Sequence, residues 1–447
     1  MARRKRIGLR EALTSLLPRR QLDKMAAQAG LQKRQRKVRA HALFWTLVLG
    51  FGTGRDRTLA ALRRAYKLSG GGRLAPSAFY ARFTVALVRF LKTVLGVLIE
   101  RVAEPARALQ GPLAAFQDLV LTDSTVIRLH EMLAPIFPGC RTNHTKAALK
   151  MHVVFSATGS GPRSIRVTSE RTHDGPVLRV GQWLKDRLLL MDLGYFRYQL
   201  FSCIRRNGGY FIVRLKQNAN PLVVAAHRFW RGRSVPLVDR RIRDVLGSLR
   251  RQVVDVEVDL GFQRRAYGGK RRRDHERFRL VGVRDQKTGA YHLYLTNIPP
   301  EKLSAEDIAQ TYAARWAIEL LFRELKSRYR AEDMPSRKRV VVEALVYAVL
   351  ITLIVSRHLL AALRAKLGLL GRRVPVERWA ILFAAVARDL LRVVLRRSSD
   401  IAALLRSVED TLLDEAIDPN VSRKLLLERV ESRTQFRDRY LVGEAYA

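Results

Sequence analysis

This chain of 447 residues has few cysteines and few acids. Its two cysteines, Cys140 and Cys203, have no CxxC partner, so no zinc finger is readable and a disulfide framework is not expected. Asp and Glu number 40 against 83 Lys and Arg, which gives a net charge of +43. Such an excess attracts polyanions, with nucleic acid ahead of an acidic membrane surface or an acidic partner.

Long hydrophobic runs are also scarce. The most apolar segment, residues 340–363, is free of charge only over 344–355, which is short of the roughly 20 residues that span a membrane. We expect a buried core helix there, no membrane insertion and a cytoplasmic location. The Arg-rich start of the chain is similar to a transit peptide, but a basic DNA-binding arm fits the total charge better.

From about residue 116 the hydrophobic pattern changes from helical to strand-like. A helix is predicted over 174–184 and another near 198–208, and strands are predicted over 115–129, 149–158, 163–171, 187–196 and 209–218. Along the chain the order is strand, strand, strand, helix, strand, helix, strand. It permits an antiparallel trio followed by parallel strands, which is the layout of a ribonuclease-H-like domain. The predicted fold class is α/β, with a ribonuclease-H-like catalytic domain, a β-rich insertion and helical N- and C-terminal regions.

The rest of the chain surrounds this core. A hairpin turn is predicted at 286–289, and a helix over about 305–328 begins with Ser304 and Asp307 as a capping box. The predicted organisation is a helical basic DNA-binding region at 1–112, the first part of the core at 113–218, the insertion at 219–300, the catalytic helix of the core at 301–334, and a helical C-terminal region at 335–447.

The helix predicted over 305–328 carries an unusual polar stripe. At about 100° per residue, four side chains fall within roughly 60° of one another: Tyr312, Arg315, Glu319 and Lys326. Arg323 joins that stripe. The opposite side is apolar. The stripe is either a solvated face with i, i+4 ion pairs, each worth about 0.2–0.5 kcal/mol, or a functional surface that sets one carboxylate among cations.

Two more carboxylates follow apolar runs. Asp123 lies in the strand that contains LTDST, and Asp192 ends the strand that contains LLLMD. Strand-end aspartates often cap turns, but two desolvated carboxylates repel each other and need a cation. Carboxylates suit Mg²⁺ or Mn²⁺, and two such ions promote phosphoryl transfer. A basic cluster on the second strand, including Lys150 and His152, either faces this site or is half-exposed.

The spacing Y-x2-R-x3-E-x6-K resembles a known signature. Tyr312, Arg315, Glu319 and Lys326 match the YREK motif of DDE transposases of the bacterial insertion-sequence type, the group named for insertion sequence four. The resemblance covers roughly residues 115–340.

Both aspartates stand in contexts that resemble the same family. Asp123 is followed by Ser and Thr, as the family's first Asp commonly is, and Asp192 begins DLGY where the family commonly has DRGY or DRGF. Leu193 departs from this pattern and leaves an auxiliary phosphate contact in question, but not the metal ligand.

The resemblance implies a transposase. It implies that Asp123, Asp192 and Glu319 bind divalent metal, Mg²⁺ or Mn²⁺, as two ions. It also implies DNA contacts near the transposon end by Tyr312, Arg315 and Lys326, and Arg323 shares their stripe.

The implied reaction is nicking that leaves a 3′-OH, followed by strand transfer to target DNA in a cut-and-paste cycle. The partners are terminal inverted repeats, target DNA and a second copy of the chain, because two ends must be joined. The expected location is the bacterial cytoplasm, on the chromosome. Two other readings stay open: a DNA-binding protein without catalysis, and another ribonuclease-H-like nuclease such as a junction resolvase.

Overall fold

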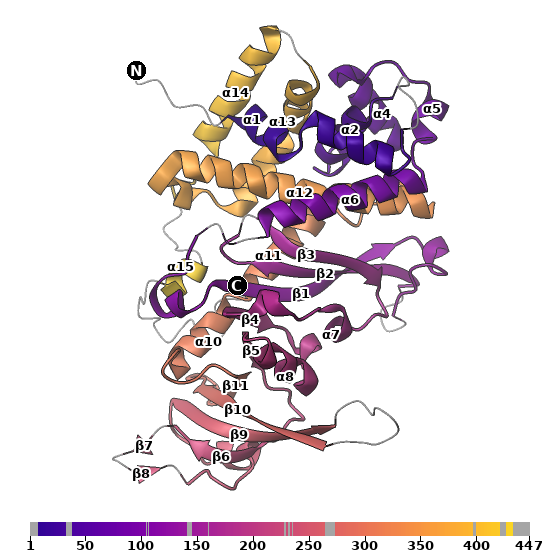
Figure 1. Ribbon diagram of the computed structural model, residues 1–447. Coiled ribbons are helices and arrows are strands. Elements are labelled where there is room, and N and C mark those ends of the chain that lie inside the picture. The colour runs from indigo at the N-terminus through magenta and orange to yellow at the C-terminus, as the bar shows by residue number, and fades with distance from the viewer. Residues whose placement is uncertain are drawn as a thin grey trace.

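The computed structural model describes residues 8–431 except 33–37, 104, 106, 141–144, 160, 228, 231–232, 235, 264–272, 397–398 and 421–425. The start of the predicted basic arm, 1–7, lies outside the described residues. The protein is a mixed α/β structure with one large sheet and helical flanks, as predicted (Figure 1).

The large sheet, as described, has nine strands in the order β3-β2-β1-β4-β5-β11-β10-β9-β6. β1 pairs antiparallel with β2 and parallel with β4, and β4 pairs parallel with β5. The strands are β1 Asp118–Leu129, β2 Ala147–Ser156, β3 Pro162–Ser169, β4 Arg187–Met191, β5 Tyr210–Arg214, β6 Leu222–Ala226, β9 Val253–Gln263, β10 Arg273–Arg284 and β11 Tyr291–Thr296. A separate small ribbon pairs β7 Phe229–Trp230 with β8 Arg233–Ser234. All five strands expected between 115 and 218 are therefore present, with shifted ends.

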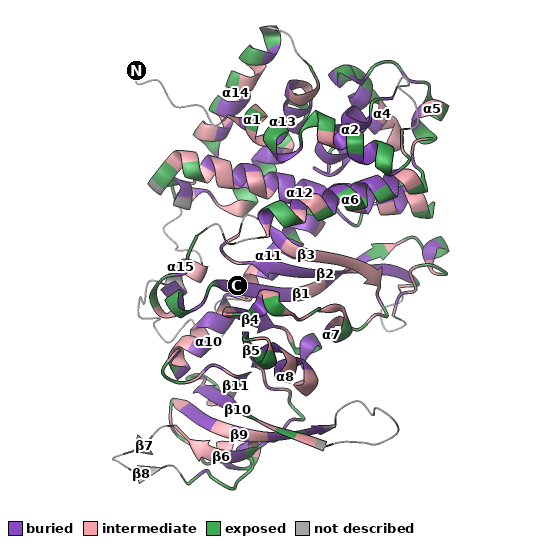
Figure 2. Cartoon of the chain, viewed as in Figure 1, coloured by how far each residue is buried: buried purple, intermediate pink, exposed green. Residues whose placement is uncertain are grey.

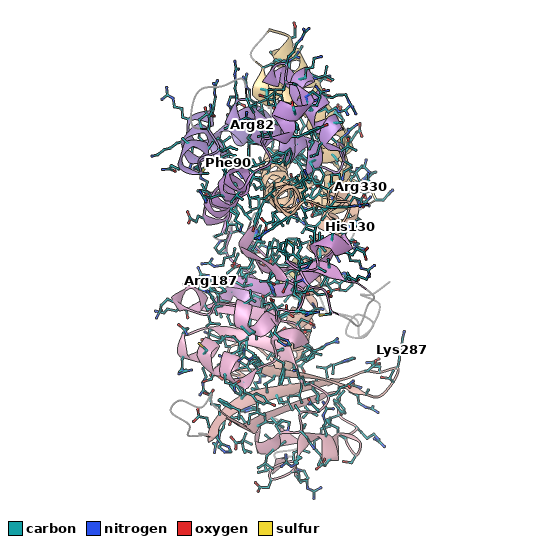
Figure 3. The ribbon with its side chains drawn as sticks, turned by 90° about the vertical axis from the view of Figure 1, so that its right-hand side faces the viewer. Arg82, Phe90, His130, Arg187, Lys287 and Arg330 are labelled. Atoms are coloured by element: carbon teal, nitrogen blue, oxygen red, sulfur yellow. The ribbon has the colours of Figure 1, made fainter. Side chains whose placement is uncertain are left out.

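The segment expected to be β-rich continues this same sheet. β11 pairs with β5, so the strands of this segment extend the sheet edge instead of forming a separate layer. The predicted hairpin joins β10 and β11, and Gly289 adopts the left-handed φ of 71° that its turn requires. Lys287 projects from this turn, whereas Phe90 points into the helical part (Figure 3).

Helices from both ends of the chain lie together on one side of the sheet (Figure 1). They are α1 Leu9–Leu16, α2 Arg19–Gln28, α3 Ala40–Thr46, α4 Leu59–Tyr66, α5 Pro76–Tyr80, α6 Val85–Val102, α12 Arg339–Leu367, α13 Val376–Leu395 and α14 Ser399–Glu415. The last short helix, α15 Leu426–Glu431, lies apart from them and contacts α10 and the turn Gly111–Ala115 (Figure 1). Among the described helices, α12 alone has the length and apolarity to cross a membrane, yet 78% of its most apolar window is buried. It packs against α6 as a core helix, as predicted (Figure 2).

Two helix predictions were wrong in extent. The helix expected over 174–184 is a single turn, α7 Asp174–Val177, and a short 3₁₀ turn at Gln182–Leu184, because Gly175, Pro176 and Gly181 interrupt it. The helix expected over 305–328 is divided into α10 Ala305–Ala313, α11 Trp316–Arg323 and a π-helical turn at Glu324–Arg328. Two further short helices are α8 Tyr198–Arg206 and α9 Ile242–Leu246.

The sheet separates two hydrophobic cores. Leu119 and Leu121 of β1 face the core shared with the flanking helices, whereas Val120 faces the core that contains Phe201 of α8. This alternation follows from the two-residue period of a strand. It places Asp123 on the face of Leu119 and Leu121.

Candidate active site

Asp123 lies in the middle of β1, between two neighbouring strands. It pairs with Val153 of β2, and its side chain is 17% exposed. The backbone N–H of Ser124 donates to Asp123 Oδ1 at 2.7 Å. The strand thus holds one largely buried carboxylate on the sheet face that α11 contacts.

Asp192 follows directly after β4. The parallel pairing of β1 and β4 ends at Thr122 and Met191, so the next residues, Asp123 and Asp192, come side by side at the same end of the two strands. Asp192 begins a short 3₁₀ turn, and Gly194 N–H donates to Asp192 Oδ2 at 3.5 Å. Parallel pairing therefore brings together two acids that are far apart in the sequence.

Arg315, at the start of α11, connects that helix to β1. Its Nη1 lies 3.3 Å from Asp123 Oδ2, and its Nη2 donates to Glu319 Oε1. The Arg315 side chain is only 12% exposed. One buried guanidinium is thus shared by the carboxylates of Asp123 and Glu319, which come from elements almost 200 residues apart.

The electrostatics link all three acids. Burial is the largest cause that raises the pKa of Asp123 to about 7. The negative charges of Asp192 and Glu319 act in the same direction, and Arg315 opposes them. The cluster is therefore short of positive charge near neutral pH.

The other residues of the predicted stripe take different places. Tyr312 is buried, its hydroxyl donates to the Met191 carbonyl at 3.1 Å, and burial raises its pKa. Lys326 Nζ lies 3.6 Å from Glu332 Oε1, and Arg323 Nη2 lies 3.2 Å from Glu377 Oε1. The structure thus joins Arg315 and Glu319 to Asp123, with Tyr312 beside the end of β4. The contacts of Arg323 and Lys326 are to other acids.

The donor set suits a hard divalent cation. Two aspartates and a glutamate supply only carboxylate oxygens, the ligands that Mg²⁺ and Mn²⁺ prefer. The raised pKa of Asp123 marks a site where added positive charge would be favourable. In the part of the chain that the structure describes, no three acids, histidines or cysteines are gathered at metal-binding distances, and Arg315 occupies the space between two of the candidates.

Asp174 is a neighbour of the site that the sequence did not single out. Its Oδ1 lies 3.2 Å from His152 Nδ1 and 3.6 Å from Lys150 Nζ. A Cβ on Gly194 would meet Asp174 Oδ2 at 3.0 Å, so α7 packs closely on the turn after Asp192. Burial raises the pKa of Asp174, but His152 and Ser124 outweigh it and lower the pKa overall. Period-two spacing of Lys150 and His152 on β2 was a sequence signal for this group.

Known proteins resemble this chain over most of its length. The transposase for insertion sequence element IS231D of Bacillus thuringiensis subsp. finitimus is 23% identical over 377 residues, covering 74% of this chain and 75% of that protein. The transposase for IS231B of Bacillus thuringiensis subsp. berliner is 23% identical over 432 residues, covering 84% and 87%. A probable transposase for IS5377 of Geobacillus stearothermophilus is 27% identical over 239 residues, covering 53% and 54%.

A solved structure and a family model complete these comparisons. The piggyBac transposase, solved by cryo-EM as a synaptic complex with hairpin DNA, is 9% identical with a TM-score of 0.47, covering 94% of this chain and 87% of that chain. The family model described as "Transposase DDE domain" matches residues 114–355, which is more than half of the chain. The resemblance predicted from the YREK spacing is confirmed, and the protein belongs to the DDE-domain transposases of bacterial insertion sequences.

Proposed function

We propose that this transposase cuts DNA at the ends of its own element and joins the resulting 3′-OH to target DNA, with Asp123, Asp192 and Glu319 as the catalytic acids. One observation carries the assignment: the guanidinium of Arg315 contacts both Asp123 and Glu319, while the charge of Asp192 acts on Asp123. A merely solvated helix face would not bring an acid of α11 to a central strand.

We also propose a ribonuclease-H-like catalytic unit. The order β3-β2-β1-β4-β5, antiparallel in its first three strands and parallel in the rest, supports it. The proposed divisions remain 1–112, 113–218, 219–300, 301–334 and 335–447, the third being the insertion whose strands extend the sheet.

The acids would hold Mg²⁺ or Mn²⁺, as two ions. Bound there, such ions supply a nucleophilic oxygen and stabilise the leaving oxygen of an in-line phosphoryl transfer. The protein's own contribution is to hold Asp123 and Asp192 on paired strands, which need no rearrangement to present both carboxylates.

Arg315 has two proposed tasks. Without metal it is the counter-ion of Asp123 and Glu319. As its second task, its guanidinium would bind a backbone phosphate beside the scissile bond, because its planar fork matches phosphate oxygens. Tyr312, Lys326 and Arg323 are proposed as DNA contacts on the same segment, with Tyr312 also bracing the end of β4.

The proposed substrates are the terminal inverted repeats and a target duplex, and the proposed assembly is a homodimer on paired ends in the bacterial cytoplasm. The net charge of +43 supports DNA as the partner. A DNA-binding protein without catalysis is the alternative, because the charge alone would serve it equally.

A cleavage assay tests this function. Purified protein is incubated with DNA that carries the inverted repeats flanking its gene, with Mg²⁺ or with EDTA. We expect metal-dependent cuts at the repeat ends, and a loss of about 10³-fold or more in Glu319→Gln with DNA binding retained, since metal catalysis supplies several kcal/mol.

The matched control is Glu301→Gln, which removes an exposed carboxylate ahead of α10. It should cut at the wild-type rate. Full cleavage by Glu319→Gln would refute the assigned acids, and tight binding without cuts under any divalent metal would favour the DNA-binding alternative.

A further inference from the structure

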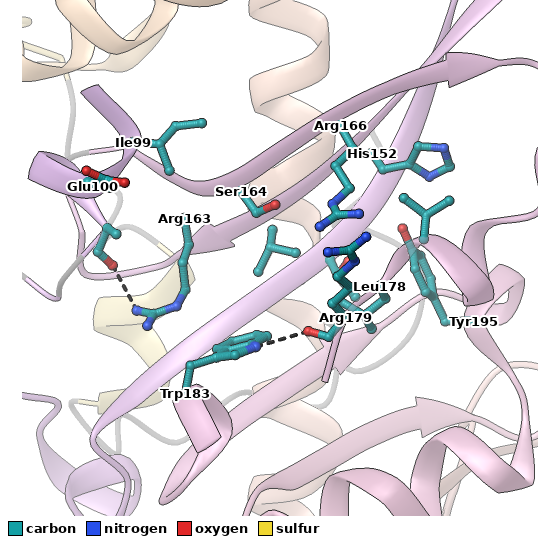
Figure 4. Close-up of a pocket in the computed structure, with 14 residues that line it drawn as sticks. Ile99, Glu100, His152, Arg163, Ser164, Arg166, Leu178, Arg179, Trp183 and Tyr195 are labelled. Atoms are coloured by element: carbon teal, nitrogen blue, oxygen red, sulfur yellow. Dashed lines mark hydrogen bonds between the residues drawn. The ribbon is translucent and has the colours of Figure 1, made fainter. Parts of the chain in front are cut away.

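A pocket of about 340 Å³ opens on the sheet face opposite to the catalytic acids (Figure 4). Its floor is formed by register partners on three neighbouring strands: Thr122 of β1 beside Val154 of β2, and Val154 beside Ser164 of β3. Side chains alternate along a strand, so Asp123, next to Thr122, points to the other face. The pocket is therefore a separate site on the back of the strand that carries Asp123.

Positive charge dominates the lining of this pocket. Arg163, Arg166 and Arg179 line it against one acid, Glu100, among the described lining residues. The guanidinium groups of Arg166 and Arg179 point toward one another in Figure 4. Among the described residues, neither guanidinium has an ion-pair or hydrogen-bond partner, and Glu100 lies at the other end of the pocket. Two like charges that face one another without a carboxylate between them favour an anion there.

The walls beside these arginines are apolar and aromatic. Trp183 is held in place because its Nε1 donates to the Arg179 carbonyl at 3.0 Å and the Arg163 guanidinium covers its ring at 5.0 Å. Leu178 and the buried ring of Tyr195 continue the wall. A ligand that fits this lining has an anionic group at one end and a flat apolar body at the other.

We propose that this pocket binds one unpaired nucleotide of a DNA strand, with its phosphate between Arg166 and Arg179 and its base against Trp183 and Leu178. Paired arginines match phosphate oxygens, and aromatic side chains take bases without regard to sequence. The volume falls at the small end of the range for ligand pockets, about 300–1,000 Å³, which admits one nucleotide and not a duplex. The choice of a DNA strand as the source of this nucleotide rests on the proposed function, because a free nucleotide would offer the pocket the same phosphate and base.

Calorimetric titration of the full chain in EDTA tests the proposal. The probes are dAMP, inorganic phosphate and a short single-stranded oligonucleotide. We expect the Arg166→Gln/Arg179→Gln double variant to bind the oligonucleotide at least tenfold more weakly, as loss of charge-assisted hydrogen bonds predicts. Phosphate alone should bind more weakly than dAMP, because it lacks the base.

The control is Arg128→Gln, which removes one positive charge from an exposed position on β1 outside the pocket. It should bind each probe within twofold of wild type. Trp183→Phe, which keeps a ring in the wall, should retain most of the affinity, whereas Trp183→Ala should lose it.

The outcomes distinguish a nucleotide within a DNA strand from a free nucleotide. Weaker binding of the oligonucleotide, with or without dAMP, by the double variant supports the proposal. If the double variant bound only dAMP more weakly, and the oligonucleotide as wild type does, the pocket would bind a free nucleotide and the proposal of a DNA strand would be refuted. Equal losses in the double variant and in Arg128→Gln would refute the pocket. None of these readouts depends on cleavage, so a negative result for the nucleotide pocket would not count against the catalytic acids.

Discussion

A buried ion pair between β9 and β10 holds the segment that leads to α10. Arg279 of β10 donates from Nε to Asp255 Oδ1 at 2.7 Å and from Nη2 to Oδ2 at 2.6 Å. Its Nη1 also donates to the carbonyls of Ile298 and Leu303, at 3.2 and 2.7 Å. Leu303 precedes the N-cap of α10, so one guanidinium fastens the start of that helix to the sheet.

Removal of either charge should be costly. The two side chains are only 4% and 5% exposed, and loss of one partner from a buried pair costs about 3–5 kcal/mol because the other charge stays desolvated. We expect Asp255→Asn to lower the free energy of unfolding by about 3 kcal/mol. Arg279→Met should lower it by about 4–5 kcal/mol, since it also leaves two carbonyls without their donor. The double variant Asp255→Leu/Arg279→Met should lose less than the sum of the single variants.

Urea unfolding followed by circular dichroism measures these differences. The control is Glu377→Gln, which breaks the ion pair with Arg323 where both side chains are 57% exposed, and it should cost less than about 1 kcal/mol. A cost for Asp255→Asn no larger than that of the control would refute the reasoning, and so would full additivity in the double variant.

Two further predictions concern the core. Burial raises the pKa of Asp118 from 3.8 to about 6, so its contribution to stability is complete below pH 3.8 and is lost as pH rises through 6. At about 1.4 kcal/mol per pKa unit, the full loss in the free energy of unfolding is about 3 kcal/mol. More than half of it has already occurred by about pH 5, so between about pH 5 and pH 8 the wild type should lose about another 1–1.5 kcal/mol relative to Asp118→Asn. A difference between the two proteins in urea unfolding that does not change with pH would contradict this reasoning. Gly52→Ala should lower the melting temperature by several degrees, because a Cβ there would lie 1.8 Å from Thr352 Oγ1 of α12; an unchanged melting curve would show that the contact relaxes freely.

Local patterns predicted those parts of the fold that depend on neighbouring residues. The apolar run around LVLTDST predicted β1, and Ser304 with Asp307 predicted the start of α10, where the Asp307 N–H donates to Ser304 Oγ at 3.1 Å. Asp123 and Asp192 could be paired in advance because parallel strands present equivalent ends.

Contacts between distant segments could not be predicted from such patterns. Asp255 and Arg279 each look like one of many charges on an amphipathic strand, and only the pairing of β9 with β10 shows that they are buried together. The same holds for the arginines of the pocket, since Arg166 and Arg179 come from a strand and from a loop that the sequence predicted to be helical.

The segment from Tyr312 to Arg328 shows why a helical period alone was insufficient to predict where its side chains point. The predicted stripe assumed a uniform α-helix from Tyr312 to Lys326, but the turn at Glu324–Arg328 is π-helical, and a residue in such a turn advances by less than the about 100° of an α-helix. Glu324 is the physical cause that we infer. Its side chain is 2% exposed, Arg357 of α12 donates to it at 2.5 Å, and the Tyr329 hydroxyl donates at 2.9 Å.

Glu324 begins the wider turn and Tyr329 follows it, so an α-helical continuation would rotate Tyr329 away from the Glu324 carboxylate. The buried charge would then lose one of its two partners, at a cost of about 1–3 kcal/mol. The wider turn avoids that cost, and it rotates Lys326 away from the direction of Arg315 and Glu319, toward Glu332. The α12 helix therefore sets the direction in which Lys326 leaves the catalytic segment. For this reason we expect the DNA contact of Lys326 to lie on a different part of the substrate from the contact of Arg315.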